Sequence, residues 1–122
     1  MNIETFREWC LTFPECEETL PFDECTLCFK TAGKIFAIID LNNPESVNLK
    51  AEPEQAIEWR ETYSDAVFPG YHMNKTHWNT LYFDRSVPDS LVKTMLIHSW
   101  KQVVAGMTKK KREALLQQWS EQ

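Results

Sequence analysis

The sequence predicts an α+β protein in which an antiparallel β-sheet carries helices packed on one face. Several short strand patterns follow one another between residues 26 and 50, and apolar residues recur at helical spacing near both ends of the chain. Strands grouped together with helices at the ends are typical of α+β domains rather than of parallel sheets. We expect a single domain over residues 1–122, which is long enough to bury a core.

The first helix is predicted at the very start of the chain. Asn2 is a suitable N-cap, and Pro14 ends the helix because proline cannot continue a helical hydrogen-bond pattern. The segment 15–23 is acidic and irregular, with a short edge strand or turn expected at 20–22. The helix itself is indicated by an apolar stripe formed by Ile3, Phe6, Trp9, Cys10 and Phe13.

Three strands are predicted next, at 26–30, 34–41 and 46–50. The first two flank a short turn in which Gly33 supplies a positive φ. The strand 34–41 is apolar almost throughout, which indicates a central strand covered on both sides. The strand 46–50 alternates, so Val47 and Leu49 are expected to point inward and Ser46, Asn48 and Lys50 outward.

The second half of the chain is predicted to contain two helical regions and one strand. A helix is expected to begin near Pro53, and residues 66–68 then lead into a polar loop. The aromatic segment 78–83 returns as a strand. Ser86 is expected to cap a long helix whose apolar stripe runs over 91–107, and a break at Gly106 or Thr108 separates it from a further short helix.

Charge is divided unevenly along the chain. The net charge is −5; residues 1–65 carry 5 basic and 14 acidic side chains, giving −9, and residues 66–122 carry 8 and 4, giving +4. Because phosphate backbones repel an acidic protein at long range, only a locally basic face is expected to contact nucleic acid. No run approaches ~18 apolar residues, so no membrane span is expected. The N-terminus lacks the pattern of a secretory signal, which makes the cytoplasm the expected location.

The segment 69–80 is the candidate site, because it is polar, rich in aromatics and nearly free of aliphatic residues. Aromatic rings there would stack on bases, lysines would contact phosphates, and amides would contact base edges or sugars. The alternative is a structural loop, in which the asparagines and histidines satisfy backbone groups. The candidate residues for nucleic-acid contact are Lys50, Tyr71, His72, Asn74, Lys75, His77, Trp78 and Asn79.

Neither the histidines nor the cysteines form a recognised catalytic or metal motif. His72 and His77 lie five apart without an intervening carboxylate, and His98 is expected to be a half-buried hydrogen-bonding residue. The cysteines at 10, 16, 25 and 28 are expected to be reduced packing residues, because no second CxxC completes a zinc set. We therefore expect no metal, no cofactor and no enzymatic activity.

The sequence resembles the MmcQ/YjbR family of small bacterial proteins over about residues 2–112. The resemblance implies a fold like that of frataxin (CyaY)-type proteins, an α–β–α sandwich with an antiparallel sheet. Family members are often described as DNA-binding, so the resemblance implies DNA as a partner. The matching segments are 29–30, 33–37, 48–50, 98–104 and above all Pro69-Gly70-Tyr71-His72-Met73-Asn74-Lys75-Thr76-His77-Trp78-Asn79.

Two charged segments give further expectations. The basic run 109–112 either adds to a nucleic-acid surface or is a solvated helix terminus that complements its own dipole. The acidic N-terminal region offers an alternative function, that of a protein-interaction or metal-associated adaptor acting through this face, as the resemblance to frataxin-type folds implies. A monomer or weak dimer is expected. The acidic residues are Glu4, Glu8, Glu15, Glu17, Glu18, Asp23 and Glu24.

Overall fold

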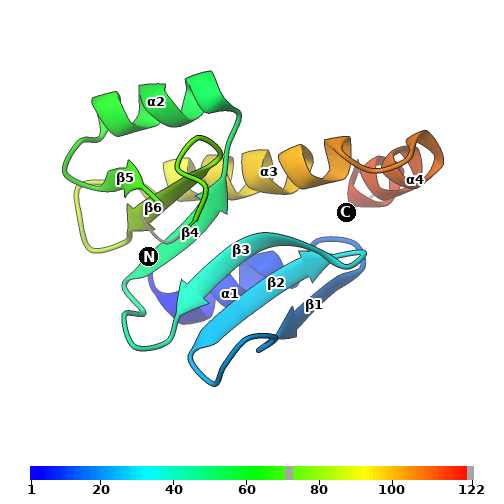
Figure 1. Ribbon diagram of the computed structural model, residues 1–122, viewed down its shortest axis with the longest axis horizontal. Coiled ribbons are helices and arrows are strands. Elements are labelled where there is room, and N and C mark those ends of the chain that lie inside the picture. Colours follow the sequence, from blue (N-terminus) through cyan, green and yellow to red (C-terminus); the bar gives the residue numbers. More distant parts are fainter. Residues whose placement is uncertain (71–72, 121–122) are drawn as a thin grey trace.

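The computed structural model describes residues 1–70 and 73–120. Within these ranges the chain alternates between a small sheet and the helices that cover it (Figure 1). In chain order the elements are α1 (Ile3–Cys10), β1 (Cys16–Thr19), β2 (Thr26–Thr31), β3 (Lys34–Asp40), β4 (Ser46–Lys50), α2 (Pro53–Thr62), β5 (Val67–Pro69), β6 (Trp78–Tyr82), α3 (Asp89–Ala105) and α4 (Lys109–Ser120).

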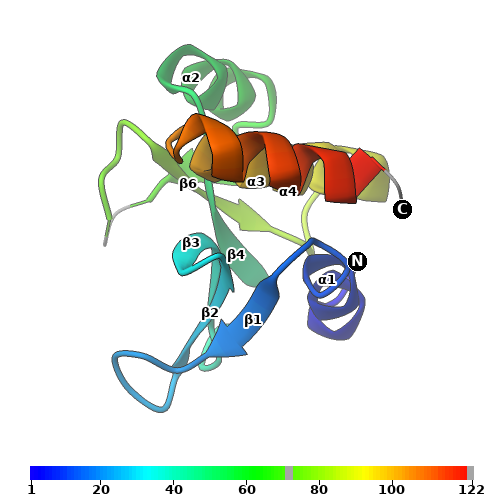
Figure 2. The ribbon, with the colours of Figure 1, turned by 90° about the vertical axis from the view of Figure 1, so that its right-hand side faces the viewer.

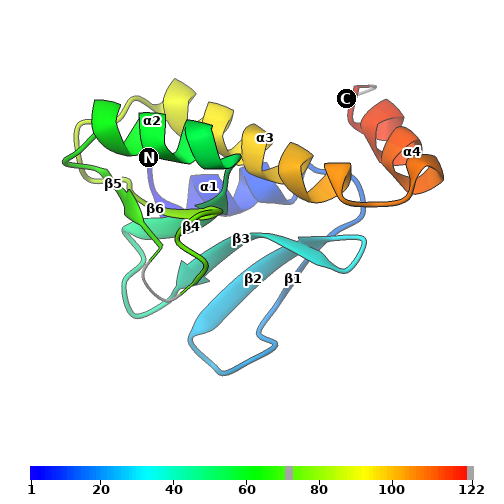
Figure 3. The ribbon, with the colours of Figure 1, turned by 45° about the horizontal axis from the view of Figure 1, so that its top comes forward.

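The strands form one antiparallel sheet in the order β1-β2-β3-β4-β6-β5. The helices α1, α2 and α3 lie on one side of it, while the β1–β2 loop and the chain entering β6 project on the other side (Figures 2 and 3). The α+β class with helices on one face is therefore confirmed. The expectation of an α–β–α sandwich is wrong, because the sheet and the helices make two layers.

The core lies between the sheet and the pair α1 and α3. The ring of Phe13 stacks on Trp100 at a centroid distance of 5.1 Å and meets Phe36 edge-on at 5.4 Å. Burying side chains of this kind stabilises the fold by roughly 1.5–3 kcal/mol each. At the start of α1, the side chain of Asn2 accepts a hydrogen bond from the backbone N–H of Thr5 at 2.9 Å, which confirms the predicted N-cap.

A β-bulge decides which residues of β3 face the core. Phe29 pairs with Ala37, but Lys30 pairs with Ile35, so Phe36 is the extra residue on β3. Phe36 and Ala37 are both fully buried, whereas Ile35 is only half-buried on the opposite side. The expectation that this strand is covered on both sides is therefore wrong. The bulge concentrates apolar residues on the helix side, and the other face stays open.

The hydroxyl of Ser99 ties α3 to the two central strands. β3 and β4 pair directly at Ala37–Leu49 and Ile38–Asn48. At the next position the Ser99 hydroxyl donates to the carbonyl oxygen of Phe36 at 2.6 Å and accepts from the backbone N–H of Lys50 at 2.8 Å. The hydroxyl thus bridges two backbone groups where the direct ladder ends. Both would otherwise be buried without partners.

Three further expectations differ from the structure. The acidic segment after α1, expected to be irregular, contains the strand β1. Of the two alternatives for residues 20–22, the edge strand is wrong, and the chain bends there. Residues 67–69 form the edge strand β5 rather than a simple lead into the loop, because they pair with β6. The long helix α3 is capped at Pro88 without a side-chain hydrogen bond, so Ser86 is not its N-cap. Pro88 itself supplies the extended backbone that precedes the first helical turn.

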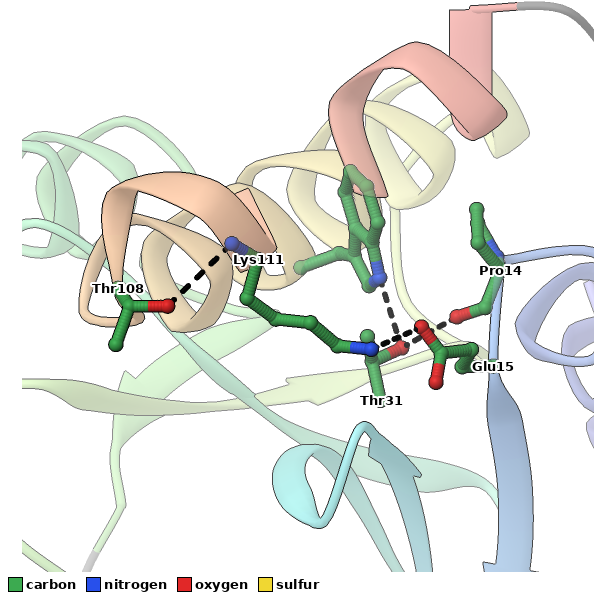
Figure 4. A network of polar contacts seen from close by, with 6 residues as sticks. Pro14, Glu15, Thr31, Thr108 and Lys111 are labelled. Carbon is green, nitrogen blue, oxygen red and sulfur yellow. Dashed lines mark hydrogen bonds and ion pairs between the residues drawn. The ribbon is translucent and has the colours of Figure 1, made fainter. Parts of the chain in front are cut away.

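The basic run 109–112 begins α4 rather than ending a helix. Positive charges at a helix N-terminus oppose the dipole, so the expectation of a complemented terminus is wrong. Instead, Lys111 pairs with Glu15 at 2.5 Å, and the Thr108 hydroxyl accepts from the backbone N–H of Lys111 at 3.3 Å (Figure 4). Beside this pair, the buried Trp100 indole donates to the hydroxyl of Thr31 at 2.8 Å.

The Ser99 bridge generates a stability prediction. Ser99→Ala removes both hydrogen bonds and leaves the Phe36 carbonyl and the Lys50 N–H without partners. Because each unsatisfied buried group costs about 1–3 kcal/mol, we expect the free energy of unfolding to fall by about 2–4 kcal/mol. Urea denaturation followed by circular dichroism measures this change.

Ser90→Ala is the matched control, since Ser90 is exposed in the first turn of the same helix. It is expected to change the free energy of unfolding by less than about 0.5 kcal/mol, as surface substitutions usually do. If the two variants lost equal stability, the bridging role of Ser99 would be refuted.

Candidate functional site

The uncovered face of the sheet collects a row of polar and aromatic side chains from β4 and β6. Side chains alternate along a strand, so Asn48 and Lys50 share one face of β4, and Trp78, Thr80 and Tyr82 share one face of β6. Lys50 is directly opposite Trp78, and Asn48 is directly opposite Thr80. We call this side of the sheet the open face.

A first depression in the open face lies between the β1–β2 loop and the start of β6. It encloses about 540 Å³. Ile35 and Ile38 of β3 contribute apolar surface, Trp78 comes from β6, and Phe22 comes from the β1–β2 loop with 71% of its surface exposed. The remaining lining residues are Thr26, Asp40, Asn48, Met73 and Asn74.

A second depression of about 510 Å³ continues along the open face toward the end of β6. Here the guanidinium of Arg85 lies 4.0 Å from the ring centroid of Tyr82 and 5.5 Å from that of Phe68. Stacking of this kind holds the cation in place. The guanidinium is also held by the chain itself, because its Nη1 donates to the carbonyl oxygen of Asp65 at 3.1 Å and its Nε lies 4.0 Å from a carboxylate oxygen of Asp84. Asp40 and Asn48 line both depressions, so the two are contiguous.

The loop before β6 is organised by its own hydrogen bonds. The backbone carbonyl of Asn74 accepts from the backbone N–H of Trp78 at 2.9 Å, and its side-chain oxygen accepts from the N–H of Thr76 at 2.9 Å. Gly70 lies against Trp78, where an added Cβ would come within 3.1 Å of the Trp78 carbonyl oxygen. Glycine therefore lets the two segments approach without displacing Trp78, which lines the first depression.

Part of the predicted site is brought together by this geometry. Lys50 is paired with Trp78 across β4 and β6, and Trp78 and Asn74 line the first depression. Lys50 itself lines a separate depression near the end of α3, together with Lys34 and Gln102. Lys75 is exposed on the same loop, and His77 is half-buried, its backbone carbonyl accepting from Ala51 at 2.8 Å. The predicted residues Tyr71 and His72 lie outside the described residues.

Asn79 is separated from the other predicted site residues. It is only 5% exposed and lies on the helix side of the sheet, where its amide donates to the carbonyl oxygen of Ala56 at 3.1 Å. Its own side-chain oxygen is buried and has no hydrogen-bond partner within residues 1–70 and 73–120. Asn79 therefore has the structural role that we considered as the alternative to nucleic-acid contact. The amide of Asn79 is not part of the open face. Asn74 combines both roles, since it organises the loop and lines the depression.

Sequence reasoning missed much of the open face. The alternation that placed Asn48 outward applies equally to β6, where it places Thr80 and Tyr82 on the same side as Trp78 and Asn79 on the other. That signal was present in the sequence. The additional open-face residues are Phe22, Ile35, Ile38, Asp40, Asn48, Phe68, Thr80, Tyr82 and Arg85.

The titratable side chains of the covered side are adapted to burial rather than to reactivity. Burial raises the pKa of Cys10 well above its usual range, and burial, followed by the charge of Glu18, raises the pKa of Cys16 to about 11. Both thiols are therefore protonated at neutral pH, and all four cysteines are free. Among residues 1–70 and 73–120, no three or more His, Cys, Asp or Glu side chains are grouped to hold a metal ion.

Three of the seven acidic side chains of the N-terminal region, those of Glu15, Glu18 and Asp23, make internal contacts. Glu18 forms a bidentate pair with Arg7, which lowers the pKa of that carboxyl through the side-chain hydrogen bond. Glu15 pairs with Lys111. Asp23 accepts from the backbone N–H groups of Cys25 and Thr26, and these bonds lower its pKa. These carboxylates hold α1, α4 and the β1–β2 loop in place.

The architecture defines a class of small α+β proteins with a one-sided antiparallel sheet. Crystal structures in this class include Deinococcus radiodurans protein DR2400, described with a DUF419 domain. That structure matches with a TM-score of 0.86 and 35% identity over 93% of this chain and 87% of its own. A Pseudomonas syringae protein shares the fold with a TM-score of 0.71 at 20% identity, covering 84% of this chain and 99% of its own.

The chain belongs to the YjbR family, whose model matches residues 11–102. It is 34% identical to the uncharacterized protein YjbR of Escherichia coli K12 over 118 residues, which are 96% of this chain and 99% of the relative. The uncharacterized protein YbdF of Escherichia coli O157:H7 is 33% identical over 108 residues, or 88% of each chain. The likeness to frataxin-type folds stays a prediction. No helix among the described residues has the length and apolar character to cross a membrane.

His98 generates a prediction about pH. Its Nε2 accepts from the backbone N–H of Glu52 at 3.1 Å, its ring meets Trp59 edge-on, and burial lowers its pKa below 6.5. Because the unfolded chain then binds the proton more readily, the His98 contribution to stability is complete above about pH 6.5 and is lost as the pH falls through the lower folded-state pKa. Proton NMR titration of the His98 ring should report this low pKa.

His98→Gln provides the comparison, because its amide oxygen can accept the same hydrogen bond without titrating. The variant should show a weaker decrease of Tm between pH 7.5 and pH 5.5 than the parent protein. A His98 pKa at or above 6.5, together with identical pH profiles, would contradict this assignment.

Proposed function

We propose that the protein is a non-enzymatic, cytoplasmic nucleic-acid-binding protein that binds single-stranded DNA on the open face. The observation that carries the proposal is the open face itself. It places the ring of Trp78 directly opposite Lys50 and continues to Arg85, which is stacked on Tyr82. The described helices leave this face uncovered (Figure 3).

The chemistry of the open face suits unpaired bases better than a duplex. Bases stack on aromatic side chains whatever their sequence, and each stacked base contributes about 1–3 kcal/mol. Lys50 and Arg85 stand at opposite ends of the polar pair Asn48 and Thr80, where each can contact a phosphate of the same strand. Duplex readout usually inserts a helix or a two-stranded ribbon into the major groove, whereas this face is a broad shallow sheet.

Two observations favour a binding protein of the cytoplasm. The buried thiols of Cys10 and Cys16 have raised pKa values, so they do not act as nucleophiles at neutral pH. All four cysteines are free, as in proteins of a reducing compartment. The proposal includes a monomer or weak dimer, because each copy has a complete open face.

The proposal predicts that single-stranded DNA binds in a salt-sensitive manner. Fluorescence anisotropy with a labelled ~12-nucleotide strand should show weaker binding at ~200 mM than at ~50 mM salt, because contacts to phosphate release counterions. A duplex of equal length should bind more weakly. Trp78→Ala should lower affinity by roughly 5- to 100-fold, the loss of about one stacked base.

Lys50→Ala and Lys110→Ala form a matched pair for the same measurement. Both remove one lysine charge, but Lys110 is exposed on α4, away from the open face. Lys50→Ala should reduce the slope of log affinity against log salt by about 0.7, the value for one phosphate contact on a single strand, and Lys110→Ala should leave the slope unchanged. Absence of binding at ~50 mM salt, or equal effects of the two variants, refutes the proposal.

A further inference from the structure

One carboxylate borders both depressions of the open face, where a nucleic-acid surface would be expected to avoid negative charge. Asp40, at the end of β3, lines both depressions together with Asn48 of β4. Asn48 pairs with Ile38, which is two residues before Asp40 on the same face of β3. Asp40 and Asn48 are therefore diagonal neighbours across two strands, a spacing of about 7–8 Å that a single base edge can bridge.

The hydrogen bonds that Asp40 and Asn48 already make determine which of their polar atoms can still bind a ligand. The Thr80 hydroxyl donates to Oδ1 of Asn48 at 2.6 Å, which leaves the Asn48 amide group as a donor. Oδ1 of Asp40 accepts from the backbone N–H of Asn42 at 2.9 Å, and within residues 1–70 and 73–120 no donor bonds its other oxygen, Oδ2. The open face thus offers an anionic acceptor beside a neutral donor.

We propose that Asp40 and Asn48 select guanine, a preference that rests on the proposed binding of single-stranded DNA. A carboxylate accepts two parallel hydrogen bonds from two adjacent donors. Guanine has such a pair on its Watson–Crick edge, the N1–H and the 2-amino group, and next to them the O6 acceptor suits the Asn48 amide. Thymine has one donor between two carbonyl oxygens, which the carboxylate repels. Adenine and cytosine each have a single amino group on this edge.

The surroundings of Asp40 fit this assignment. Trp78 lines the same depression and provides a ring on which a base can stack. Phe22 stands on the β1–β2 loop with most of its ring exposed, although burial would be favourable for it. Two aromatic rings and the polar pair thus line one depression that can hold a flat, polar heterocycle.

The test compares oligo-dT strands that carry one central dG, dI, dA or dT, measured by fluorescence anisotropy at ~100 mM salt. Inosine differs from guanine only by the missing 2-amino group. We expect dG to bind roughly tenfold more tightly than dI or dT, which is the size of a good charge-assisted base contact. D40N should abolish this difference, because it exchanges one acceptor oxygen for an amide donor while keeping the other oxygen for Asn42.

E58Q is the control, since Glu58 is exposed on α2 and its replacement also removes one negative charge. It should keep the preference for dG, and circular dichroism should show that both variants fold. Equal binding of all four strands by the parent protein overturns the inference while leaving DNA binding intact. A uniform gain in affinity with D40N and an unchanged dG preference overturns it as well, because Asp40 would then act through its charge alone. If no strand binds, the proposed function itself fails.

Discussion

The hydroxyl of Ser99 is the point at which the helical layer and the two halves of the sheet are joined. It replaces a direct bond between β3 and β4, satisfying the Phe36 carbonyl and the Lys50 N–H in one step. Because these backbone groups are fixed from the helix side, the Lys50 side chain is held on the opposite side, facing Trp78. The position of the candidate site therefore depends on a hydrogen bond that the ligand would never contact.

The bulge in β3 gives the sheet one face that is buried against the helices and one face that is exposed to solvent. By turning both Phe36 and Ala37 toward α1 and α3, it supplies the core with apolar groups from adjacent positions. The open face keeps aromatic rings that a purely stability-driven sequence would bury or replace. Phe22 is the extreme case, with 71% of its surface exposed. Exposed aromatics grouped on one surface are a common property of binding sites.

The parts of the fold that local rules specify could be predicted from the sequence. Asn2 as a cap, Gly33 in the hairpin turn and the outward position of Lys50 all follow from patterns within a few residues. The strand β1 was missed because its acidic residues lack an apolar alternation; pairing with β2 and the Arg7–Glu18 contact stabilise it instead. The bulge at Phe36 cannot be recognised in a uniformly apolar strand.

The candidate site was predicted only in part, because local sequence patterns do not show which distant segments meet on one face of the sheet. Treating 69–80 as one polar loop grouped Trp78 with Asn79, although neighbouring residues of a strand point to opposite faces. Strand alternation alone separates them and adds Thr80 and Tyr82. The contributions of Phe22, Asp40 and Arg85 could not be read from the sequence, because they reach the open face through pairing and loop geometry between distant segments.

The two borders of the sheet restrict how copies of this protein can associate. A free strand edge is a template on which another chain can polymerise. Here β1 has only four residues, among them charged Glu17 and Glu18, and β5 has three and ends in Pro69, which has no backbone N–H to offer. Head-to-tail growth of a continuous sheet is therefore disfavoured at both ends. Crowded molecules would keep their sheets separate even though each displays an aromatic surface to the solvent.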